Sequence, residues 1–257
     1  QLATAPSLGA VLFDTNAKTQ VLSALDATAV QSEGYRTIRA NLQYVNVDDP
    51  IHAFVVTSAA PGDGKTTVAC NLAIAVAQAG RKVCLVEADL RRPRVSEYLQ
   101  LNAQTGLTEV LSGQIKLEDA LQDWGRGMLK VPPPGAIPPN PSELLGSHQM
   151  AQVISNLKRE FDVVILDTPP LLAVSDAAVL ASQADGAVVV VRHGKSSKDA
   201  VRNAVASLEQ INANILGTVL NAVPVKRGGS YGYAYGYGYG DGKPSGDYKK
   251  PAIQQGA

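Results

Sequence analysis

Apolar, mostly β-branched runs alternate with helical patterns through the middle of this 257-residue chain. Five such runs occupy residues 53–57, 82–86, 163–166, 187–191 and 215–220. Each run is almost continuously apolar, which is typical of strands buried on both faces of a sheet. Because helical patterns separate the runs, we expect a doubly wound α/β domain, with helices on both faces of a mostly parallel sheet.

Two flanking segments lack this alternation. Residues 1–50 mix short apolar pieces with one helical stretch at 32–44, and residues 226–257 are rich in Gly and Tyr. The second segment has Ile253 as its only Ile, Leu or Val, so it cannot build a core. We expect three parts: an N-terminal segment (1–50), a domain (51–225) and a disordered Tyr/Gly-rich tail (226–257).

The amino-acid composition of the chain mainly argues against certain classes of function. The 23 Lys and Arg balance 23 Asp and Glu, so bulk charge attracts neither nucleic acid nor an anionic membrane. No run reaches the roughly 18 apolar residues that a transmembrane helix needs, and no signal peptide opens the chain. Cys70 and Cys84 lie in apolar surroundings, which indicates a reducing compartment. We interpret the start at Gln1, without Met, as that of a fragment.

A glycine-rich turn follows the first apolar run. Residues 59–66 read Ala-Ala-Pro-Gly-Asp-Gly-Lys-Thr and lead into an apolar helical stretch. A strand, such a turn and a helix N-terminus form the context of a phosphate-binding P-loop, in which backbone N–H groups face one anion. Lys65 would reach the β- and γ-phosphates, and Thr66 would coordinate Mg²⁺. The nucleotide-binding candidates here are Ala60, Pro61, Gly62, Asp63, Gly64, Lys65, Thr66 and Thr67.

Carboxylates stand at the ends of two further runs. Glu87 and Asp89 follow residues 82–86, and Asp167 follows residues 163–166. Because ligands of doubly wound sheets bind beyond the carboxyl ends of the strands, these groups should lie beside the P-loop. A hard cation that bridges phosphates takes one or two such oxygens, whereas each aspartate alone could simply cap a helix. The candidate metal ligands are Thr66, Asp89 and Asp167, the last as a Walker B carboxylate.

Together these motifs resemble those of the bacterial tyrosine kinases, in the cytoplasmic catalytic domain that works with polysaccharide co-polymerases. That family has a P-loop, a second motif of apolar residues followed by D-x-D-x-R, and a Walker B motif with D-x-x-P. Here they stand at residues 59–66, 87–91 and 167–170, and residues 137–145 are similar to a further family signature. Glu87 stands where the family usually has Asp, which leaves the role of that position open.

The resemblance implies a P-loop NTPase fold related to MinD and ParA, with the activity of an ATP- and Mg²⁺-dependent protein-tyrosine autokinase. It makes Lys65, Glu87, Asp89 and Asp167 the catalytic candidates, and Arg91 a further phosphate-binding candidate. MinD- and ParA-type ATPases carry a lysine at the position of Ala60. Its absence argues against a MinD/ParA-like partitioning ATPase but does not exclude other ATPases of the same fold. The alternatives are a MinD/ParA-like ATPase switch and a nucleotide-dependent assembly module without kinase activity.

Six of the nine tyrosines lie in the tail, mostly alternating with Gly or Ala. They are Tyr231, Tyr233, Tyr235, Tyr237, Tyr239 and Tyr248. Glycine spacing allows a phenol to reach a neighbouring active site, although a low-complexity aromatic tail without catalytic meaning has the same composition. The resemblance implies that this cluster is autophosphorylated in trans.

Glu33, Arg36 and Arg39 are spaced to lie near one helix face. Such charges commonly form a solvated surface, but in the family E-x-x-R-x-x-R is an oligomerisation element. The resemblance implies a ring-shaped homo-oligomer, an octamer, with a transmembrane activator segment fused upstream or on a separate chain, and a cognate tyrosine phosphatase. It also implies a cytoplasmic location at the inner face of the plasma membrane, control of exopolysaccharide or capsule synthesis and export, and no nucleic-acid partner.

Overall fold

The computed structural model describes residues 5–13, 30–46 and 50–224 of the chain. The strands are β1 (Ser7–Phe13), β2 (Ala53–Ser58), β3 (Val83–Glu87), β4 (Gln122–Trp124), β5 (Leu129–Val131), β6 (Val163–Asp167), β7 (Gly186–Arg192) and β8 (Ile215–Pro224). The helices are α1 (Val30–Tyr44), α2 (Lys65–Gln78), α3 (Val95–Leu99), α4 (Leu107–Leu111), α5 (Leu117–Ala120), α6 (Pro141–Leu145), α7 (His148–Glu160), α8 (Asp176–Gln183) and α9 (Lys198–Gln210).

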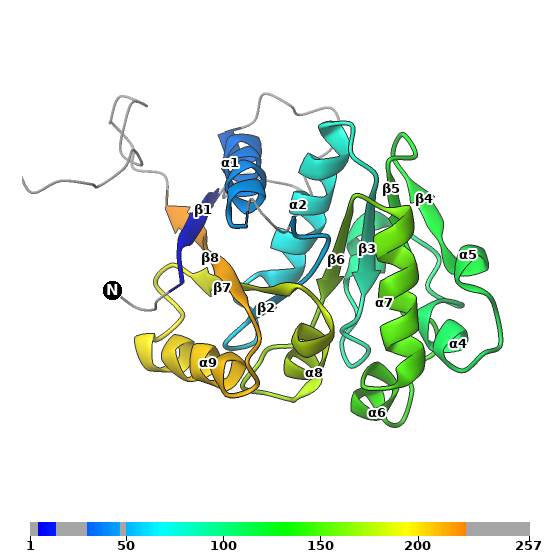
Figure 1. Cartoon of the computed structure of the whole chain (residues 1–257). Coiled ribbons are helices and arrows are strands. Elements are labelled where there is room, and N and C mark those ends of the chain that lie inside the picture. The colour runs from blue at the N-terminus through cyan, green and yellow to red at the C-terminus, as the bar shows by residue number, and fades with distance from the viewer. Residues whose placement is uncertain (1–4, 14–29, 47–49, 225–257) are drawn as a thin grey trace, which may run out of the picture. The chain divides into compact units, whose positions relative to one another are not determined.

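One sheet of eight strands runs in the order β1-β8-β7-β2-β6-β3-β5-β4 (Figure 1). Every neighbouring pair is parallel except β4 and β5. The chain divides into two units, Gln1–Val225 and Lys226–Ala257. The second unit, with the six candidate phosphoacceptor tyrosines, lies outside the described residues.

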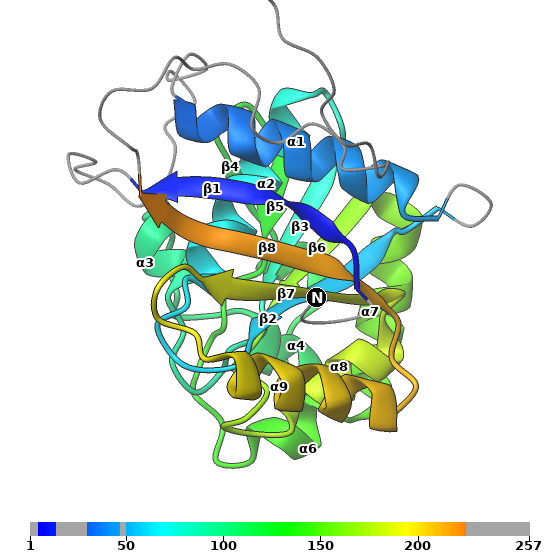
Figure 2. The ribbon, with the colours of Figure 1, turned by 90° about the vertical axis from the view of Figure 1, so that its left-hand side faces the viewer.

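Helices cover both faces of the sheet, and each face has its own apolar core. Side chains of α1, α2 and α3 pack on one face, and side chains of α4 to α9 pack on the other. Figure 2 shows α1 and α9 on opposite sides of the strands. Most of α2 is buried, because the sheet lies on one side of this helix and α1 on the other. The predicted doubly wound, mostly parallel α/β fold is confirmed.

The N-terminal segment is built into this sheet, a feature that the sequence pattern did not predict. β1 pairs in parallel with β8, and α1 packs over β1. At Gly9 φ is +150°, and an added Cβ would lie 3.0 Å from Cγ1 of Ile38, so glycine permits the close approach of α1. Residues 7–13 and 30–44 therefore complete the edge of the domain.

Register places the predicted motifs at one edge of the sheet. Asp167, the last residue of β6, lies opposite Val56 of β2 on one side and Glu87 of β3 on the other. The turn that follows β2 leads to α2. The glycine-rich turn and the acidic strand ends are thus neighbours, because three adjacent parallel strands end at the same edge of the sheet.

Within the described ranges, no helix is long and apolar enough to cross a membrane.

A candidate nucleotide and phosphoryl-transfer site

The turn between β2 and α2 has the backbone of an anion-binding loop. Gly62 (φ +83°) and Gly64 (φ +92°) adopt left-handed conformations that favour glycine. The loop also bonds to itself, since the N–H of Ala60 donates to Oδ2 of Asp63 at 3.3 Å. α2 begins directly after the loop, so its positive dipole end adds to the field at the same place.

Lys65 and Asp89 form an ion pair at this edge. Nζ of Lys65 lies 2.9 Å from Oδ2 of Asp89 and 3.3 Å from the hydroxyl of Thr66. Both side chains of the pair are largely buried, with 13% and 6% exposed. Burial alone would lower the pKa of Lys65, but the Asp167 and Asp89 carboxylates outweigh it and raise this pKa above its ordinary value. Lys65 therefore stays cationic beside the loop.

Asp167 is fully buried and accepts the Thr66 hydroxyl at 2.7 Å through Oδ2. Its other oxygen, Oδ1, has no hydrogen-bond partner among the described residues. Burial raises the pKa of Asp167 to about 7, against the opposing effects of Lys65 and Thr66. A buried carboxylate oxygen without a partner, next to a hydroxyl, offers the kind of oxygen ligands that Mg²⁺ prefers.

Glu87 faces a different neighbour from the other carboxylates. Its Oε1 accepts from the N–H of Val95 at 2.5 Å, and its Oε2 accepts from the N–H and the hydroxyl of Ser96 at 3.0 and 2.6 Å. These donors belong to the first turn of α3. Burial raises the pKa of Glu87, although the donated hydrogen bonds oppose this. The extra methylene is thus used to cap a helix, and both carboxylate oxygens are engaged there.

Arg91, the candidate phosphate ligand, is held by Asp176. Its Nε and Nη2 donate to the two carboxylate oxygens of Asp176 at 2.8 and 3.2 Å. Ser142, in the proline-rich signature, joins both groups: it accepts from Nη2 at 2.9 Å and donates to Asp176 at 2.5 Å. Asp176 is completely buried at the start of α8. Ser142 lies within the signature predicted at residues 137–145, whereas no sequence signal pointed to Asp176, which does not stand at a strand end.

Three further side chains, none of them among the predicted site residues, donate hydrogen bonds to backbone carbonyl groups of the P-loop. They are Arg192 at the end of β7, Lys195 in the turn after it, and Asn221 within β8. Arg192 and Asn221 are register partners on neighbouring strands. A sequence signal was available for two of them, because Arg192 and Asn221 each stand directly after an apolar run, as Asp167 does.

The predicted oligomerisation residues have two kinds of environment. Glu33 and Arg36 form an exposed ion pair at 2.8 Å, one turn apart on α1. Arg39 instead donates from Nη1 to the carbonyl of Ala75 at 2.7 Å, in the last turn of α2. Tyr35, which lies between Glu33 and Arg36 in the sequence, is buried, and its hydroxyl accepts a hydrogen bond from Asn71 of α2 at 3.3 Å. The helix is thus fastened to α2 while Glu33 and Arg36 remain at the surface.

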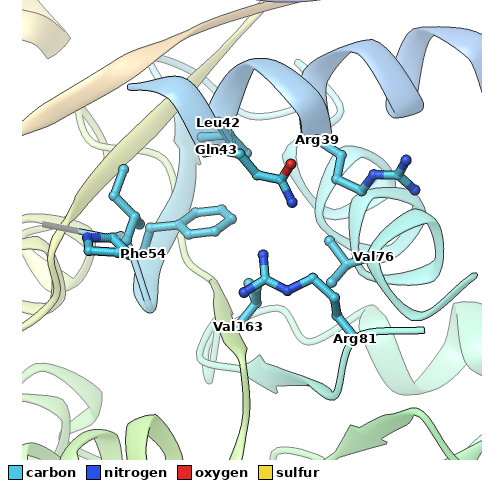
Figure 3. A pocket seen from close by; sticks show the side chains of 9 residues that line it. Arg39, Leu42, Gln43, Phe54, Val76, Arg81 and Val163 are labelled. Atoms are coloured by element: carbon cyan, nitrogen blue, oxygen red, sulfur yellow. The ribbon is translucent and has the colours of Figure 1, made fainter. Parts of the chain in front are cut away.

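A hollow of about 220 Å³ lies at the opposite edge of the sheet, where β2 and β6 begin. Its lining residues are Arg39, Leu42, Gln43, Pro50, Ile51, Phe54, Val76, Arg81 and Val163. Gln43 from α1 and Arg81 from the turn after α2 reach into it (Figure 3). Because Phe54 and Val163 stand at the amino ends of their strands, this hollow is separate from the P-loop edge.

Comparison with known proteins agrees with this site. A P-loop between a strand and a helix, with an aspartate at the end of the strand that lies beside it in the sheet, defines a nucleotide-binding P-loop NTPase domain. The AAA domain family matches residues 53–220. The tyrosine-protein kinase YwqD of Bacillus subtilis is 41% identical over 213 residues, which are 83% of this chain and 90% of that protein. The chain belongs to the family of bacterial tyrosine-protein kinases.

Other relatives extend the comparison. The tyrosine-protein kinase Etk of Escherichia coli K12 is 38% identical over 201 residues, which are 78% of this chain but only 28% of that protein. The crystal structure of the chimerical protein CapA2B2 superposes with a TM-score of 0.80 at 34% identity, covering 86% of this chain and 96% of the other. The structure of the cell division ATPase MinD of Pyrococcus furiosus superposes with a TM-score of 0.57 at 30% identity. That match covers 66% of this chain and 71% of MinD. The similarity to CapA2B2 is thus more extensive than the similarity to MinD.

Proposed function

We propose that this chain is an ATP- and Mg²⁺-dependent protein-tyrosine autokinase that phosphorylates its C-terminal tyrosine cluster in trans. One observation carries the proposal: Lys65, Thr66, Asp89 and Asp167 meet at the P-loop of a chain from the tyrosine-protein kinase family. A MinD/ParA-like switch is less well supported, because Ala60 occupies the position of that group's additional lysine.

The P-loop residues 60–67 would hold the phosphates of ATP. Oδ1 of Asp167 and the Thr66 hydroxyl fit a Mg²⁺ ion, since the first is buried without a partner and the second is adjacent. When bound, Mg²⁺ would neutralise charge on the β- and γ-phosphates. Lys65 would then donate to the phosphate oxygens in place of part of its present contact with Asp89.

Transfer would proceed by attack of a tyrosine hydroxyl oxygen on the γ-phosphorus. The bond from phosphorus to the β–γ bridging oxygen breaks, ADP leaves with that electron pair, and the phenolic proton passes to a carboxylate. We assign that carboxylate to Asp89, which lies at the loop with Lys65. Positioning and charge neutralisation supply most of the acceleration, and the general base contributes on the order of 10²–10⁴-fold.

Glu87 and Arg91 receive supporting roles in this proposal. Glu87 caps α3 and so holds residues 90–94, which connect Asp89 to that helix. Arg91 binds Asp176 and Ser142, and so ties the second motif to α6 and α8. Both residues would shape the site from its border, and the phosphates would be bound by the P-loop.

The wider setting follows from the family and is part of the proposal. The Glu33–Arg36 surface of α1 would contact the next subunit of a ring, an octamer by resemblance, so that each tail meets a neighbour's site. A transmembrane activator segment would hold the chain at the inner face of the plasma membrane, in the cytoplasm. A tyrosine phosphatase would reverse the modification, and the cycle would regulate the synthesis and export of exopolysaccharide or capsule.

Intact-mass analysis after incubation with MgATP tests the central proposal, with peptide mapping to locate the phosphates. We expect several additions of one phosphate mass, all on tail tyrosines, and none with Lys65→Met. ATP hydrolysis without phosphotyrosine would instead establish an ATPase switch. Nucleotide-dependent assembly without either reaction would establish an assembly module.

A further inference from the structure

Three consecutive carbonyl groups of the P-loop each accept a hydrogen bond from outside the loop. Nζ of Lys195 donates to the carbonyl of Pro61 at 3.2 Å, and Nη1 of Arg192 donates to that of Gly62 at 2.9 Å. Nδ2 of Asn221 donates to the carbonyl of Asp63 at 2.9 Å. The three donors thus follow the loop residue by residue along its outer side.

Planarity of the peptide unit gives this arrangement a consequence for the inner side. In a trans peptide the N–H points opposite to the C=O of the same unit, so the N–H groups of Gly62, Asp63 and Gly64 point away from the three donors. A donor placed on a carbonyl also polarises the whole unit and strengthens its N–H as a donor. The side chains that bind the carbonyls therefore turn the N–H groups toward the phosphate position and make them better anion ligands.

The three donors are themselves held in place. Arg192 and Asn221 are register partners on the neighbouring strands β7 and β8, and β7 lies next to β2, the strand that leads into the loop. The amide of Asn221 is oriented at both ends, since its Oδ1 accepts from the N–H of Ala222 at 2.9 Å. Asn221 is buried, and Ala222 adopts φ +59°, a left-handed conformation that is unusual for alanine.

The turn after β7 is closed in the same way. The N–H of Arg192 donates to the Ser196 hydroxyl at 2.8 Å, and the N–H of Lys195 donates to the carbonyl of Arg192 at 3.2 Å. Space is tight on this side, because a Cβ added at Gly62 would strike Nζ of Lys195 and one at Gly64 would strike Nδ2 of Asn221. The two glycines of the loop thus also make room for the clamp.

We propose that Arg192, Lys195 and Asn221 form an outer clamp, which holds the P-loop in its anion-binding shape and polarises three of its peptide units. They are positioning residues, since they act on the phosphates through the backbone. The proposal rests on the proposed nucleotide binding and is independent of whether phosphate is transferred to tyrosine. Two cations, one at the end of β7 and one in the turn after it, thereby support a loop that has Ala60 where MinD- and ParA-type ATPases have a lysine.

Amide NMR of the full chain, free and with MgADP, tests the clamp directly. Each variant should move the resonance of one particular amide to lower frequency: Gly62 in Lys195→Met, Asp63 in Arg192→Met, and Gly64 in Asn221→Ala. The matched controls are Lys198→Met and Arg202→Met, on the α9 helix that follows the same turn. They should leave all three resonances in place. A merely structural contribution would move many resonances together, so unmoved amides of the loop or identical patterns in all variants would overturn the proposal.

Affinity for MgADP provides the second measurement, by calorimetry. Each clamp variant should bind about threefold to tenfold more weakly, which is the range for loss of one hydrogen bond. Lys195→Arg should restore the affinity, because it returns a cation within reach of Pro61. An equal loss of MgADP affinity in Lys198→Met would contradict the clamp, and so would full affinity in both Lys195→Met and Arg192→Met. These outcomes remain decisive even if the buried Asn221→Ala variant fails to fold. Because no transfer step is measured, this failure is distinguishable from failure of the kinase proposal.

Discussion

The hydroxyl of Thr66 donates to Oδ2 of Asp167 at 2.7 Å and so joins the first turn of the P-loop helix to the end of the neighbouring strand. The two residues are 101 positions apart in the chain. Oδ1 of Asp167 is buried and has no hydrogen-bond partner within the described part of the chain, and this is the oxygen proposed above as a Mg²⁺ ligand.

Replacement of Lys65 should remove activity without unfolding the chain. Lys65→Met keeps the apolar stem but loses the cation that would bind the phosphates, so autophosphorylation should fall by about 10²-fold or more. Circular dichroism should remain that of the wild type. Lys82→Met, at the exposed amino end of β3, is the matched control and should retain activity. Near wild-type phosphotyrosine in Lys65→Met would mean that the P-loop has been misassigned.

Asp167 should give the free protein a particular dependence of stability on pH. Its pKa rises from 3.8 to about 7 on folding, so the folded state holds a proton that the unfolded chain has lost between those values. The free energy of unfolding should therefore fall as pH rises from about 4 to 7 and level off above. Urea unfolding of wild type and Asp167→Asn at pH 5.5 and 8 (both in the absence of nucleotide) measures this. The variant should lose that contribution to the slope, whereas Asp123→Asn, an exposed control, should keep it.

Mg²⁺ binding should be coupled to the same proton. The ion needs the ionised carboxylate, so MgADP affinity should decline as pH falls below about 7, and binding should release protons. Calorimetry in two buffers of different ionisation enthalpy measures the number released. An identical heat in both buffers at pH 6.5 would exclude Asp167 as the group that titrates.

Glu87 and Asp89 should separate into structural and chemical roles. Glu87→Gln turns one hydrogen-bond acceptor into a donor that faces the start of α3, so the free energy of unfolding should drop by about 1–3 kcal/mol. Its transfer rate under saturating MgATP should stay within a few-fold of wild type, whereas Asp89→Asn should abolish transfer and keep most of the nucleotide affinity. If Glu87→Gln instead abolishes transfer at unchanged stability, Glu87 is the general base.

Assembly should depend on the exposed part of the α1 charge cluster. Glu33→Ala combined with Arg36→Ala should give smaller particles in light scattering and less autophosphorylation, because charged contacts set the register between subunits. Arg39→Ala should instead lower stability, since Arg39 bonds to Ala75 within the same chain. Wild-type particle size for the double variant would exclude this surface as the contact.

Phosphorylation of the tail should loosen the assembly. Up to six phosphates of about −1.5 to −2 charges each would repel one another at a shared rim. A variant with all six tail tyrosines replaced by Phe should remain large after MgATP treatment, whereas the wild type should become smaller. Equal masses for phosphorylated and unphosphorylated wild type, across protein concentrations, would rule out the switch.

The sequence predicted the fold and the P-loop edge because both rest on local patterns. Apolar β-branched runs identify buried parallel strands, and the residues that follow them must meet at one edge. The same rule applies to Arg192 and Asn221, but an arginine and an asparagine lack the direct association with metal and phosphate that an aspartate has. β1 was missed because residues 7–13 are a short edge segment interrupted by Gly9.

Other features depend on contacts that no local pattern specifies. The role of Glu87 was left open, since the sequence gives the length of the side chain but not the position of the α3 backbone that it caps. The contact of Arg91, the predicted phosphate ligand, with Asp176 joins two residues that are 85 positions apart in the chain. The direction of Arg39, into its own domain, likewise follows from the packing of α1 on α2.

α2 has the P-loop at one end and Arg39 on the carbonyl of Ala75 near the other. At 14 residues it is a rod of about 21 Å, buried along most of its length and therefore stiff. A neighbouring subunit that displaced Arg39 would shift α2. It would thereby change the position of the P-loop at the other end of this helix, where the phosphates would bind. By thermodynamic linkage the effect is reciprocal: the factor by which a neighbour changes nucleotide affinity is the factor by which nucleotide changes the affinity for that neighbour.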